Sequence, residues 1–475
     1  MEVESLEMYC PVPIDRLLAS VLPPGALFAV GGRVRDEIRA ELNGSRLSES
    51  DLDYVVVGLT VAELTAALST LGPVDIVGSA FAVLKVRIGH ETVDVALARR
   101  EYSTGSGHRD FAVQSGPEVS LLDDLSRRDF RMNMIARAIP SGELVDPYAG
   151  EADIRAARID ILAEQSFEDD PLRMLRAAQF AARFDFRLTD RTLTAMRSSA
   201  HLTSLISAQR VRDELIKLLV LAPRPSVGLE LLRISDLLKY IWPELLEGVG
   251  VDQNEYHAYD VWGHAMASID ATPQGDLCLR LAALLHDVGK PRTKEGPHFY
   301  RHEQVGADLV QAMLERWHFA SHQSEDVVGV IRGHMYTNSP EQSDAAVRRF
   351  IRRVTPERLG LQFSLRHADV VGSGLPERGD WNSRFEARVA SELAKKHALR
   401  LADLAISGRD VIEIMVARGE AGPGFRGDGR VGGALNWLLE QVTDAPERNE
   451  TAALRALLSF YFDAAPHAQA SPTGA

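Results

Sequence analysis

The chain has 475 residues and a formal net charge of −14 at neutral pH, with 45% hydrophobic and 25% charged residues. This length is too great for one hydrophobic core and predicts several domains. The composition is that of a globular protein and excludes fibrous and low-complexity classes. The negative charge excludes nucleic-acid binding through the overall field, so any such contact must use local basic patches.

The cysteines and the N-terminus predict a cytoplasmic protein. Cys10 and Cys278, the two cysteines, support no disulfide framework. We find no apolar run long enough to span a membrane, and the N-terminus MEVESLEMYCPVP is acidic where a signal peptide would be basic.

Residues 26–100 alternate short β-branched runs with helical stretches, which predicts a layer of strands and helices. The expected strands are LFAVGG, LDYVVVG, VDIVG, AVLKVRIG and TVDVALARR, with the helix VAELTAALSTL among them. From about residue 155 onward the periodicity is mostly helical. The small, polar residues 466–475 are expected to be disordered.

Two carboxylates, Asp51 and Asp53, stand at the start of an apolar strand and would project from the same face. Aspartates are common in exposed turns, so the pair alone is equally consistent with a strand end. A divalent metal would instead cancel their mutual repulsion. Asp94, on a nearby expected strand, adds a third carboxylate.

A Gly-Gly pair between the first strand and a basic helix provides the second indication. Glycines at this position let backbone N–H groups approach a phosphate, and Gly31 and Gly32 are followed closely by Arg33 and Arg35. Phosphate-cradling glycines, arginines and metal-binding carboxylates together are typical of phosphoryl or nucleotidyl transfer.

Five motifs in order resemble the bacterial tRNA nucleotidyltransferase and poly(A) polymerase family, the class II enzymes of the polymerase β superfamily. The motifs are GGRVRD, DLD, RRDFRMNMIA (127–136), DPYAG (146–150) and EDDPLRMLRAAQFAARFDF (168–186). The resemblance implies an α+β fold, with a polymerase β-like head of mixed sheet and helices followed by all-α neck, HD and C-terminal domains. It also implies that Asp51 and Asp53 are the catalytic pair and bind Mg²⁺.

The resemblance implies a nucleotide-binding set as well. Gly31, Gly32, Arg35 and Asp36 would shape the triphosphate pocket, and the RRDF motif would contact sugar and phosphate. Near residue 169, an acid pair and an arginine would read the edge of the incoming base, with Asp169 standing where the family usually has Glu. The remaining residues expected to bind nucleotide are Arg128, Asp129, Asn133, Asp170, Arg173, Arg176 and Arg183.

Four arginines lie on one face of the helix expected to begin near Asp169. Arg173, Arg176, Arg183 and Arg187 fall within about 80° of one another, and the rest of the helix is apolar nearly all round. A buried arginine stripe would need anionic partners. A solvated edge or internal salt bridges are the alternative interpretation.

Histidines and aspartates in the second half resemble those of HD-domain metal-dependent phosphohydrolases. His264, His286, Asp287 and Asp369 are expected to bind a divalent metal such as Mn²⁺, Ni²⁺ or Co²⁺, and His302 and His334 lie between them in sequence. Whether this domain is catalytic or structural stays open. The run AVRRFIRRVTPERL is a candidate surface for the RNA backbone, with a solvated helix face equally consistent.

The expected activity is template-independent addition of C and A residues to the 3′ end of tRNA, and the HD site would repair blocked ends. The expected partners are the tRNA 3′ end, CTP and ATP, with neither membrane nor DNA. The Gly/Ser-rich segment Glu101–Ser120, read as a flexible loop, favours full CCA addition. CC-only addition, A-only addition, poly(A) addition and an RNA-binding HD phosphohydrolase with an inactive head are the alternatives.

These motifs also predict the domain organisation. An N-terminal segment would be followed by the head, a helical neck that selects nucleotides and binds RNA, the HD domain, a helical tRNA-binding module and a tail. The expected ranges are 1–25, 26–150, 151–248, 249–375, 376–465 and 466–475.

Overall fold

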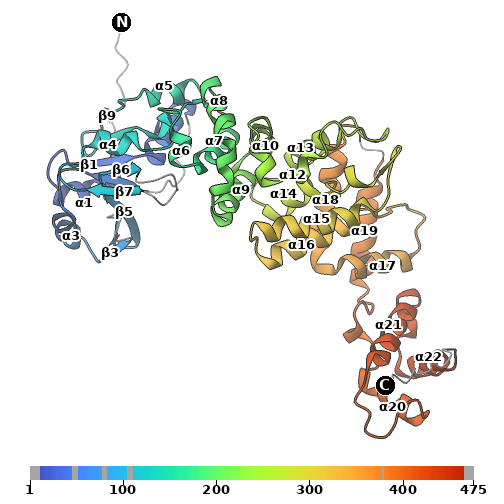
Figure 1. The fold of residues 1–475 in the computed structure, drawn as a ribbon. Coiled ribbons are helices and arrows are strands. Elements are labelled where there is room, and N and C mark those ends of the chain that lie inside the picture. The colour runs from blue at the N-terminus through green and yellow to red at the C-terminus, as the bar shows by residue number, and fades with distance from the viewer. Residues whose placement is uncertain (1–10, 45–51, 78–82, 104–110, 377–378, 465–475) are drawn as a thin grey trace, which may run out of the picture. The chain divides into compact units, whose positions relative to one another are not determined.

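The computed structural model describes residues 11–44, 52–77, 83–103, 111–376 and 379–464 (Figure 1). Asp51, Cys10 and the tail expected to be disordered lie outside these residues. The chain divides into two compact units, which are described separately. The first comprises residues 1–249, 273–280 and 312–319, and the second comprises residues 250–272, 281–311 and 320–475.

A seven-stranded mixed sheet forms the framework of the head, in the order β3-β4-β5-β2-β1-β8-β9. Its central β2 runs parallel to β5 and antiparallel to β1, so both sides of β2 are paired. All five expected strands are present. The strands are β1 (Leu27–Val30), β2 (Asp53–Val56), β3 (Val74–Val77), β4 (Val83–Ile88), β5 (Glu91–Leu97), β8 (Ala136–Ala138) and β9 (Leu144–Val145).

A buried ion-pair network ties the first helix to the sheet. Asp15, fully buried in α1, accepts two hydrogen bonds from Arg33 at 2.8 and 2.7 Å and one from the Tyr54 hydroxyl at 2.5 Å. Arg33 is therefore a core residue and does not face a phosphate. The helices of the head are α1 (Pro13–Val21), α2 (Gly32–Asn43), α3 (Val61–Ser69), α4 (Leu121–Ser126) and α5 (Gly150–Arg155).

The segment Glu101–Ser120 differs from the loop that the sequence analysis predicted. β6 (Arg99–Ser103) and β7 (Phe111–Ser115) pair antiparallel in full register, from Arg99 opposite Ser115 to Ser103 opposite Phe111. The Gly/Ser-rich centre of the segment, residues 104–110, lies outside the described residues. The prediction was wrong for residues 101–103 and 111–115, because β-favouring residues flank that centre, as in a hairpin.

The neck that follows is helical, as expected, and its central helix α7 packs against α9 and α10 (Figure 1). Two short strands, β10 (Arg158–Ile159) and β11 (Arg187–Leu188), pair in parallel beside it. The neck helices are α6 (Ser166–Asp169), α7 (Leu172–Phe184), α8 (Asp190–Ser199), α9 (Ala208–Leu221), α10 (Pro225–Ile234), α11 (Leu238–Ile241) and α12 (Pro243–Leu246).

The second half is almost entirely helical, which confirms the α+β fold class with the strands concentrated in the head. A two-stranded hairpin of β12 (Lys294–Glu295) and β13 (His298–Phe299) is its only sheet among the described residues. The helices are α13 (Val261–Asp270), α14 (Leu277–Leu285), α15 (His302–Arg316), α16 (Ser321–Gly333), α17 (Asp344–Val354), α18 (Leu359–Gly372), α19 (Trp381–Ala394), α20 (Gly408–Ala417), α21 (Gly429–Asp444) and α22 (Thr451–Ala464).

Three arginines of α17 make internal contacts, while Arg349 and Arg353 stay exposed on the basic run AVRRFIRRVTPERL. Arg348 is buried and donates to the carbonyl of Thr443 at 2.7 Å and to Glu392 at 2.9 Å. Arg352 donates to Glu440 at 2.9 Å, and Arg349 pairs with Asp444. Arg348, Arg349 and Arg352 hold α17 against α21, and the role of this run as a surface for RNA stays a prediction. Within the described ranges, no helix is both long and apolar enough to cross a membrane.

Candidate functional site

Asp53 and Asp94 lie side by side on two neighbouring strands. Asp53 begins β2 and is exposed, and Asp94 on the parallel strand β5 is its partner in the register. Cα partners on neighbouring strands point to the same face. Asp94 also pairs with Lys85 at 3.0 Å. Because Asp51 lies outside the described residues, the metal-binding role of the Asp51–Asp53 pair stays a prediction.

The Gly-Gly turn brings two distant motifs together. Gly31 links β1 to α2 with a φ of 65°, a backbone conformation that favours glycine. A Cβ at Gly31 would lie 2.7 Å from Nη1 of Arg128, and one at Gly32 would lie 3.4 Å from Nη2 of Arg35. The glycines therefore let two guanidinium groups approach the backbone at a helix N-terminus, where phosphate binding is favoured.

A hydrogen-bonded chain joins the head to the neck. Arg35 donates to Asn133 at 2.8 Å, Asn133 donates to Asp129 at 2.8 Å, and Arg176 on α7 donates to Asp129 at 2.9 Å. Burial alone would raise the pKa of Asp129, but Arg176 and Asn133 hold that pKa below its usual value. Asp36 pairs with Arg35 at 2.9 Å. The network fixes the orientation of five predicted nucleotide-binding residues.

The predicted base-reading pair lies at the start of α7. Asp170 has an extended backbone between α6 and α7 and pairs with Arg210 on α9 at 3.0 Å. Arg173 donates to the hydroxyl of Ser166 at 2.7 Å and to the carbonyl of Arg127. Sequence analysis missed Arg210, because no local pattern connects it to a carboxylate 40 residues earlier in the chain.

The buried arginine stripe expected on this helix is wrong in part. The helix begins at Leu172 and ends at Phe184, where Asp185 adopts a left-handed conformation. Arg187 therefore leaves the helix and is exposed in β11. Arg183 lies over the ring of Phe184 at 5.0 Å, and Arg176 uses Asp129 and Glu214 as its anionic partners. The partners are mainly internal, as the alternative interpretation proposed.

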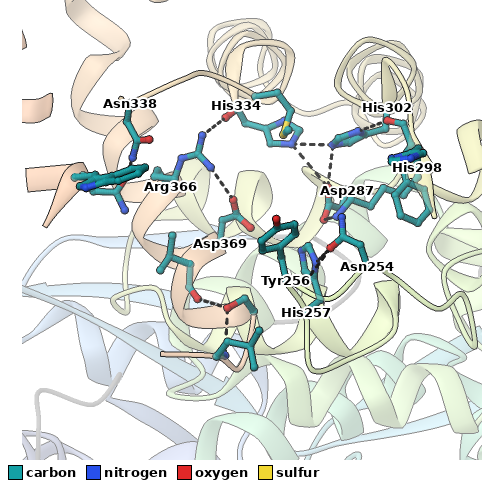
Figure 2. A pocket seen from close by; sticks show the side chains of 18 of the residues that line it. Asn254, Tyr256, His257, Asp287, His298, His302, His334, Asn338, Arg366 and Asp369 are labelled. Atoms are coloured by element: carbon teal, nitrogen blue, oxygen red, sulfur yellow. Dashed lines mark hydrogen bonds and ion pairs between the residues drawn. The ribbon is translucent and has the colours of Figure 1, made fainter. Parts of the chain in front are cut away.

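In the second unit, histidines and aspartates from several helix ends converge on one cluster, which we call the HD cluster. Its members are His264 on α13, His286 and Asp287 after α14, His302 at the start of α15, His334 after α16, and Asp369 on α18. Figure 2 shows Asp287, His302, His334 and Asp369 around one pocket. The structure therefore assembles all four predicted ligands and adds His302 and His334.

A close backbone contact positions this cluster. A Cβ at Gly289 would lie 2.3 Å from the carbonyl oxygen of His302 and 2.6 Å from the backbone nitrogen of Gly306. Only glycine fits at this separation. The contact places Asp287 beside His302, so that Oδ1 of Asp287 lies 3.3 Å from Nε2 of His302.

The two carboxylate oxygens of Asp287 face different histidines. Oδ2 lies 3.3 Å from Nε2 of both His264 and His286, and these two nitrogens are 3.1 Å apart. Oδ1 faces Nε2 of His302 at 3.3 Å and Nε2 of His334 at 3.7 Å, with 3.2 Å between the two nitrogens. Asp369 joins the first group, its Oδ1 lying 3.3 Å from Nε2 of His264.

Backbone hydrogen bonds orient three of these imidazoles so that their Nε2 atoms face into the cluster. Nδ1 of His286, His302 and His334 each lies 2.7–3.0 Å from a backbone carbonyl, which can only accept a proton. In the neutral tautomer that donates this bond, Nε2 carries a lone pair that points into the cluster. Metal-binding histidines are oriented by such bonds.

The spacings also fit a metal. Ligand atoms about 2.0–2.2 Å from one ion lie roughly 3.0–3.5 Å from one another, and the distances within each group are 3.1–3.7 Å. Lone pairs and carboxylate oxygens packed this closely repel one another unless a cation lies among them. Imidazole and carboxylate donors suit Mn²⁺, Ni²⁺, Co²⁺ or Zn²⁺.

The electrostatics of the cluster point the same way. Burial alone would lower the pKa of His286, but Asp287 and Asp369 raise it to about 10. Burial lowers the pKa of His334 to about 3. The pKa of Asp287 lies well below its usual value, because His286 and Lys290 outweigh the effect of burial. The cluster thus attracts positive charge, and Lys290, 2.6 Å from Oδ2 of Asp287, supplies part of it.

Two further residues support the ligands, and sequence analysis missed both. Arg366 donates to the carbonyls of His334 and Tyr336 at 3.1 and 2.9 Å and lies 3.5 Å from Asp369 (Figure 2). His257 forms an edge-to-face contact with His264, with 4.8 Å between the ring centres. Neither residue lies in a sequence pattern that marks it.

The fold and these sites define a nucleotidyltransferase head joined to a helical neck and an HD domain. Residues 27–160 match the family model of the poly A polymerase head domain, and residues 255–370 match that of the HD domain. Residues 185–248 match the model described as the probable RNA and SrmB-binding site of polymerase A.

The chain belongs to the multifunctional CCA protein family. It is 35% identical over 365 residues to the Multifunctional CCA protein of Cupriavidus metallidurans, covering 73% of this chain and 84% of that protein. It is 34% identical over 434 residues to the Multifunctional CCA protein of Verminephrobacter eiseniae, covering 87% of this chain and 100% of that protein.

Solved structures show the same fold. The Bacillus stearothermophilus CCA-adding enzyme in complex with CTP superposes with a TM-score of 0.61 at 23% identity, covering 95% of this chain and 96% of that one. The Thermotoga maritima CCA-adding enzyme complexed with tRNA gives a TM-score of 0.52 at 19% identity, covering 94% of this chain and 98% of that one.

Proposed function

We propose that this chain is a tRNA nucleotidyltransferase that adds CCA to the tRNA 3′ end from CTP and ATP, without a nucleic-acid template. The observation that carries the proposal is its membership of the multifunctional CCA protein family over most of its length. The contact between Gly31 and Arg128 supports it, because it joins the phosphate turn to the RRDF motif.

In this proposal Asp51 and Asp53 would hold Mg²⁺, which would supply the positive charge that lowers the pKa of a 3′ hydroxyl and neutralises a triphosphate. Gly31, Gly32 and Arg128 bind the phosphates of the incoming nucleotide. Arg35, Asp36, Asp129 and Asn133 bind its sugar and phosphates, and Arg176 and Arg183 complete the nucleotide-binding surface on α7.

We propose that Asp170 and Arg173 select the base. An aspartate and an arginine can match the hydrogen-bonding groups of C or A. The anchors of these side chains support this role, since Arg210 pairs with Asp170, and Ser166 accepts from Arg173. Each side chain is therefore held in one orientation before a nucleotide arrives.

Arg173→Ala is expected to weaken discrimination against UTP and GTP more than it weakens tRNA binding. Losing a hydrogen bond to the base costs about 1–3 kcal/mol, which is roughly a 5- to 150-fold loss of selectivity. The measurement is kcat/KM for each of the four nucleotides, with exposed Arg187→Ala as the control. If all four rates fall equally, these side chains do not read the base.

The activity can be tested with a tRNA transcript that lacks CCA. Each nucleoside triphosphate is supplied to it separately. The proposal expects CTP alone to extend this transcript, and UTP and GTP to fail, with EDTA abolishing addition. Indiscriminate incorporation would contradict it.

We propose that the HD cluster holds one or two divalent ions and hydrolyses phosphate esters at RNA ends. His264, His286, Asp287 and Asp369 hold one ion, and the other oxygen of Asp287 with His302 and His334 provides a second set of ligands. Such ions supply Lewis acidity and lower the pKa of bound water.

This activity would complement the head. Nucleotide addition needs a free 3′ hydroxyl, which a 2′,3′-cyclic or terminal phosphate blocks. Water added across one P–O bond of the cyclic ester leaves a monoester, and a second hydrolysis releases inorganic phosphate and frees both hydroxyls. The test is a tRNA that ends in a 2′,3′-cyclic phosphate. If the wild-type chain cannot extend it with CTP in Mg²⁺, Mn²⁺, Co²⁺ or Ni²⁺, the repair proposal fails.

We also propose that the protein acts in the cytoplasm and that the predicted domain ranges correspond to functional modules. The matches to the head, RNA-binding and HD models support the three central ranges. Full CCA addition is favoured over CC-only or A-only addition by the names of the relatives.

A further inference from the structure

Buried aromatic side chains form a continuous row along α7 and just beyond its end. The ring centres of Phe130 and Phe180 are 6.0 Å apart, and those of Phe180 and Phe184 are 5.5 Å apart. Phe186 extends the row, with its ring centre 5.9 Å from that of Phe184. All four side chains are buried. The row therefore runs through the interior of the first unit, from the RRDF motif to the residues that follow α7.

Two arginines of α2 lie on this row. The guanidinium carbon of Arg35 is 4.5 Å from the ring centre of Phe184 and 5.3 Å from that of Phe180. The guanidinium carbon of Arg39, one helical turn later, is 4.1 Å from the ring centre of Phe184 and 5.7 Å from that of Phe186. Phe184 is therefore the ring that both arginines share.

The two guanidinium groups also share a carboxylate. Asp36 pairs with Arg35 at 2.9 Å and with Arg39 at 3.4 Å. Burial lowers the pKa of Arg39, Asp36 opposes this effect, and the nearby charge of Arg35 adds to it. These ion pairs set one negative charge against two positive ones. The electron-rich face of an aromatic ring attracts cations, so Phe184 helps two like charges to stand close together.

Hydrogen bonds fix the guanidinium group of Arg35 within its own plane. Its Nε and Nη2 donate to the two carboxylate oxygens of Asp36 at 3.0 and 2.9 Å, and its Nη1 donates to Asn133 at 2.8 Å. Because the N–H groups of a guanidinium lie in one plane, such bonds hold the group less firmly against movement across that plane. Aromatic rings that pack on the group restrict this movement, and Phe180 and Phe184 supply them to Arg35.

We propose that Phe184 is a positioning residue that holds Arg35 at the phosphate site of the head. The inference rests on the proposed binding of nucleotide phosphates by Arg35 and deepens it. Phe184 is buried and acts through the arginine without touching the nucleotide. It lies on α7, and the proposed base-reading residues Asp170 and Arg173 stand at the start of that helix. One helix thus sets both the side chains that read the base and the arginine that receives the phosphates.

Phe184→Leu is expected to raise KM for CTP by roughly 5- to 30-fold while kcat changes little. Leucine keeps apolar bulk but removes the aromatic face, and a desolvated contact between a cation and a ring accounts for a factor of this size. The assay is addition of CTP to a tRNA transcript that lacks CCA, with cytidine as a competing ligand. Cytidine carries no phosphate, so its inhibition constant should stay the same. Calorimetric binding of CTP gives the same comparison without turnover.

Two further variants separate positioning from a general loss of packing. Phe184→Tyr keeps the ring and should keep the KM of the wild-type chain. Phe319→Leu removes a ring of similar burial in the same unit, since Phe319 is 7% exposed and Phe184 is 8% exposed. It should lower the temperature of unfolding and leave KM unchanged. Thermal unfolding of each variant reports how much packing is lost.

Arg35→Ala separates this inference from the proposed function. If Arg35→Ala leaves KM for CTP unchanged, Arg35 binds no phosphate, and that part of the proposed function fails together with the inference. If Arg35→Ala raises KM and Phe184→Leu does not, the positioning role alone is overturned. An equal loss of cytidine binding in Phe184→Leu, or a KM equally high in Phe184→Tyr, also overturns it.

A double variant completes the test. In the Arg35→Ala background, Phe184→Leu should add little to KM, because its effect passes through the guanidinium that is already absent. A full further increase would show that Phe184 acts on the site by another route and would overturn the inference.

Discussion

Asp53→Ala is expected to lower the rate of nucleotide addition by about 10³-fold or more. A catalytic metal stabilises the transition state by several kcal/mol, and each 1.36 kcal/mol is a factor of ten in rate. Asp53 is exposed at the first position of β2, so its replacement by alanine should leave the sheet intact. Asp51→Ala is expected to behave in the same way.

The measurement is single-turnover incorporation of labelled CTP, together with tRNA binding and thermal unfolding of each variant. Asp75→Ala is the matched control, since Asp75 is an exposed carboxylate on β3 of the same sheet. Binding and unfolding should be unchanged in all three variants. Substantial addition by Asp53→Ala would remove the aspartate pair from the proposed mechanism.

Asp287→Asn is expected to weaken metal binding at the HD cluster by at least about 100-fold and to abolish phosphate release from blocked tRNA. Altering even an indirect partner of a metal site costs about 10- to 100-fold in affinity, and Asp287 supplies an oxygen to both groups of histidines. Asparagine keeps the volume of the buried side chain but removes its charge.

Metal content by mass spectrometry and release of phosphate from tRNA ending in a 2′,3′-cyclic phosphate measure this effect. Asp308→Asn on α15 is the control, because Asp308 is exposed and pairs with Arg332. Extension of tRNA with a free hydroxyl should continue in both variants. Full phosphate release by Asp287→Asn would show that hydrolysis occurs elsewhere.

The local features of the head were predictable from the sequence. Hydrophobic runs placed the strands, and the Gly-Gly pair marked the passage from β1 to the basic helix, which begins at Gly32 in the structure. These features depend on neighbours in the chain. The contact of Gly31 with Arg128 was not predictable, because it joins segments about a hundred residues apart through the folded sheet.

The arginines illustrate where the sequence pattern fails. A 100° rotation per residue predicted that Arg187 continues the face of α7, but the left-handed Asp185 ends the helix first. On α17, four arginines in six residues suggested a surface for RNA, whereas Arg348 bonds to the backbone of a helix almost a hundred residues later. Helical periodicity predicts the face of the helix on which a side chain lies, but it does not predict which residue that side chain contacts.

The HD cluster was predictable from the sequence in part. His286 and Asp287 were recognisable as an adjacent pair, and all four ligands that the sequence predicted, His264 and Asp369 included, lie in the cluster. The sequence could not predict that the two carboxylate oxygens of Asp287 face different histidines. This arrangement depends on the close approach of Gly289 to His302. Only the packed helices show that His302 and His334 face its second oxygen.

The central claim is ordered addition of CCA, and three tRNA transcripts test it most directly. They lack all three, two or one of the terminal nucleotides, and each is incubated with labelled CTP or labelled ATP alone. The account predicts that CTP extends only the first two transcripts and that ATP extends only the third, by a single residue. Addition of ATP to all three, or none to the third, would contradict it.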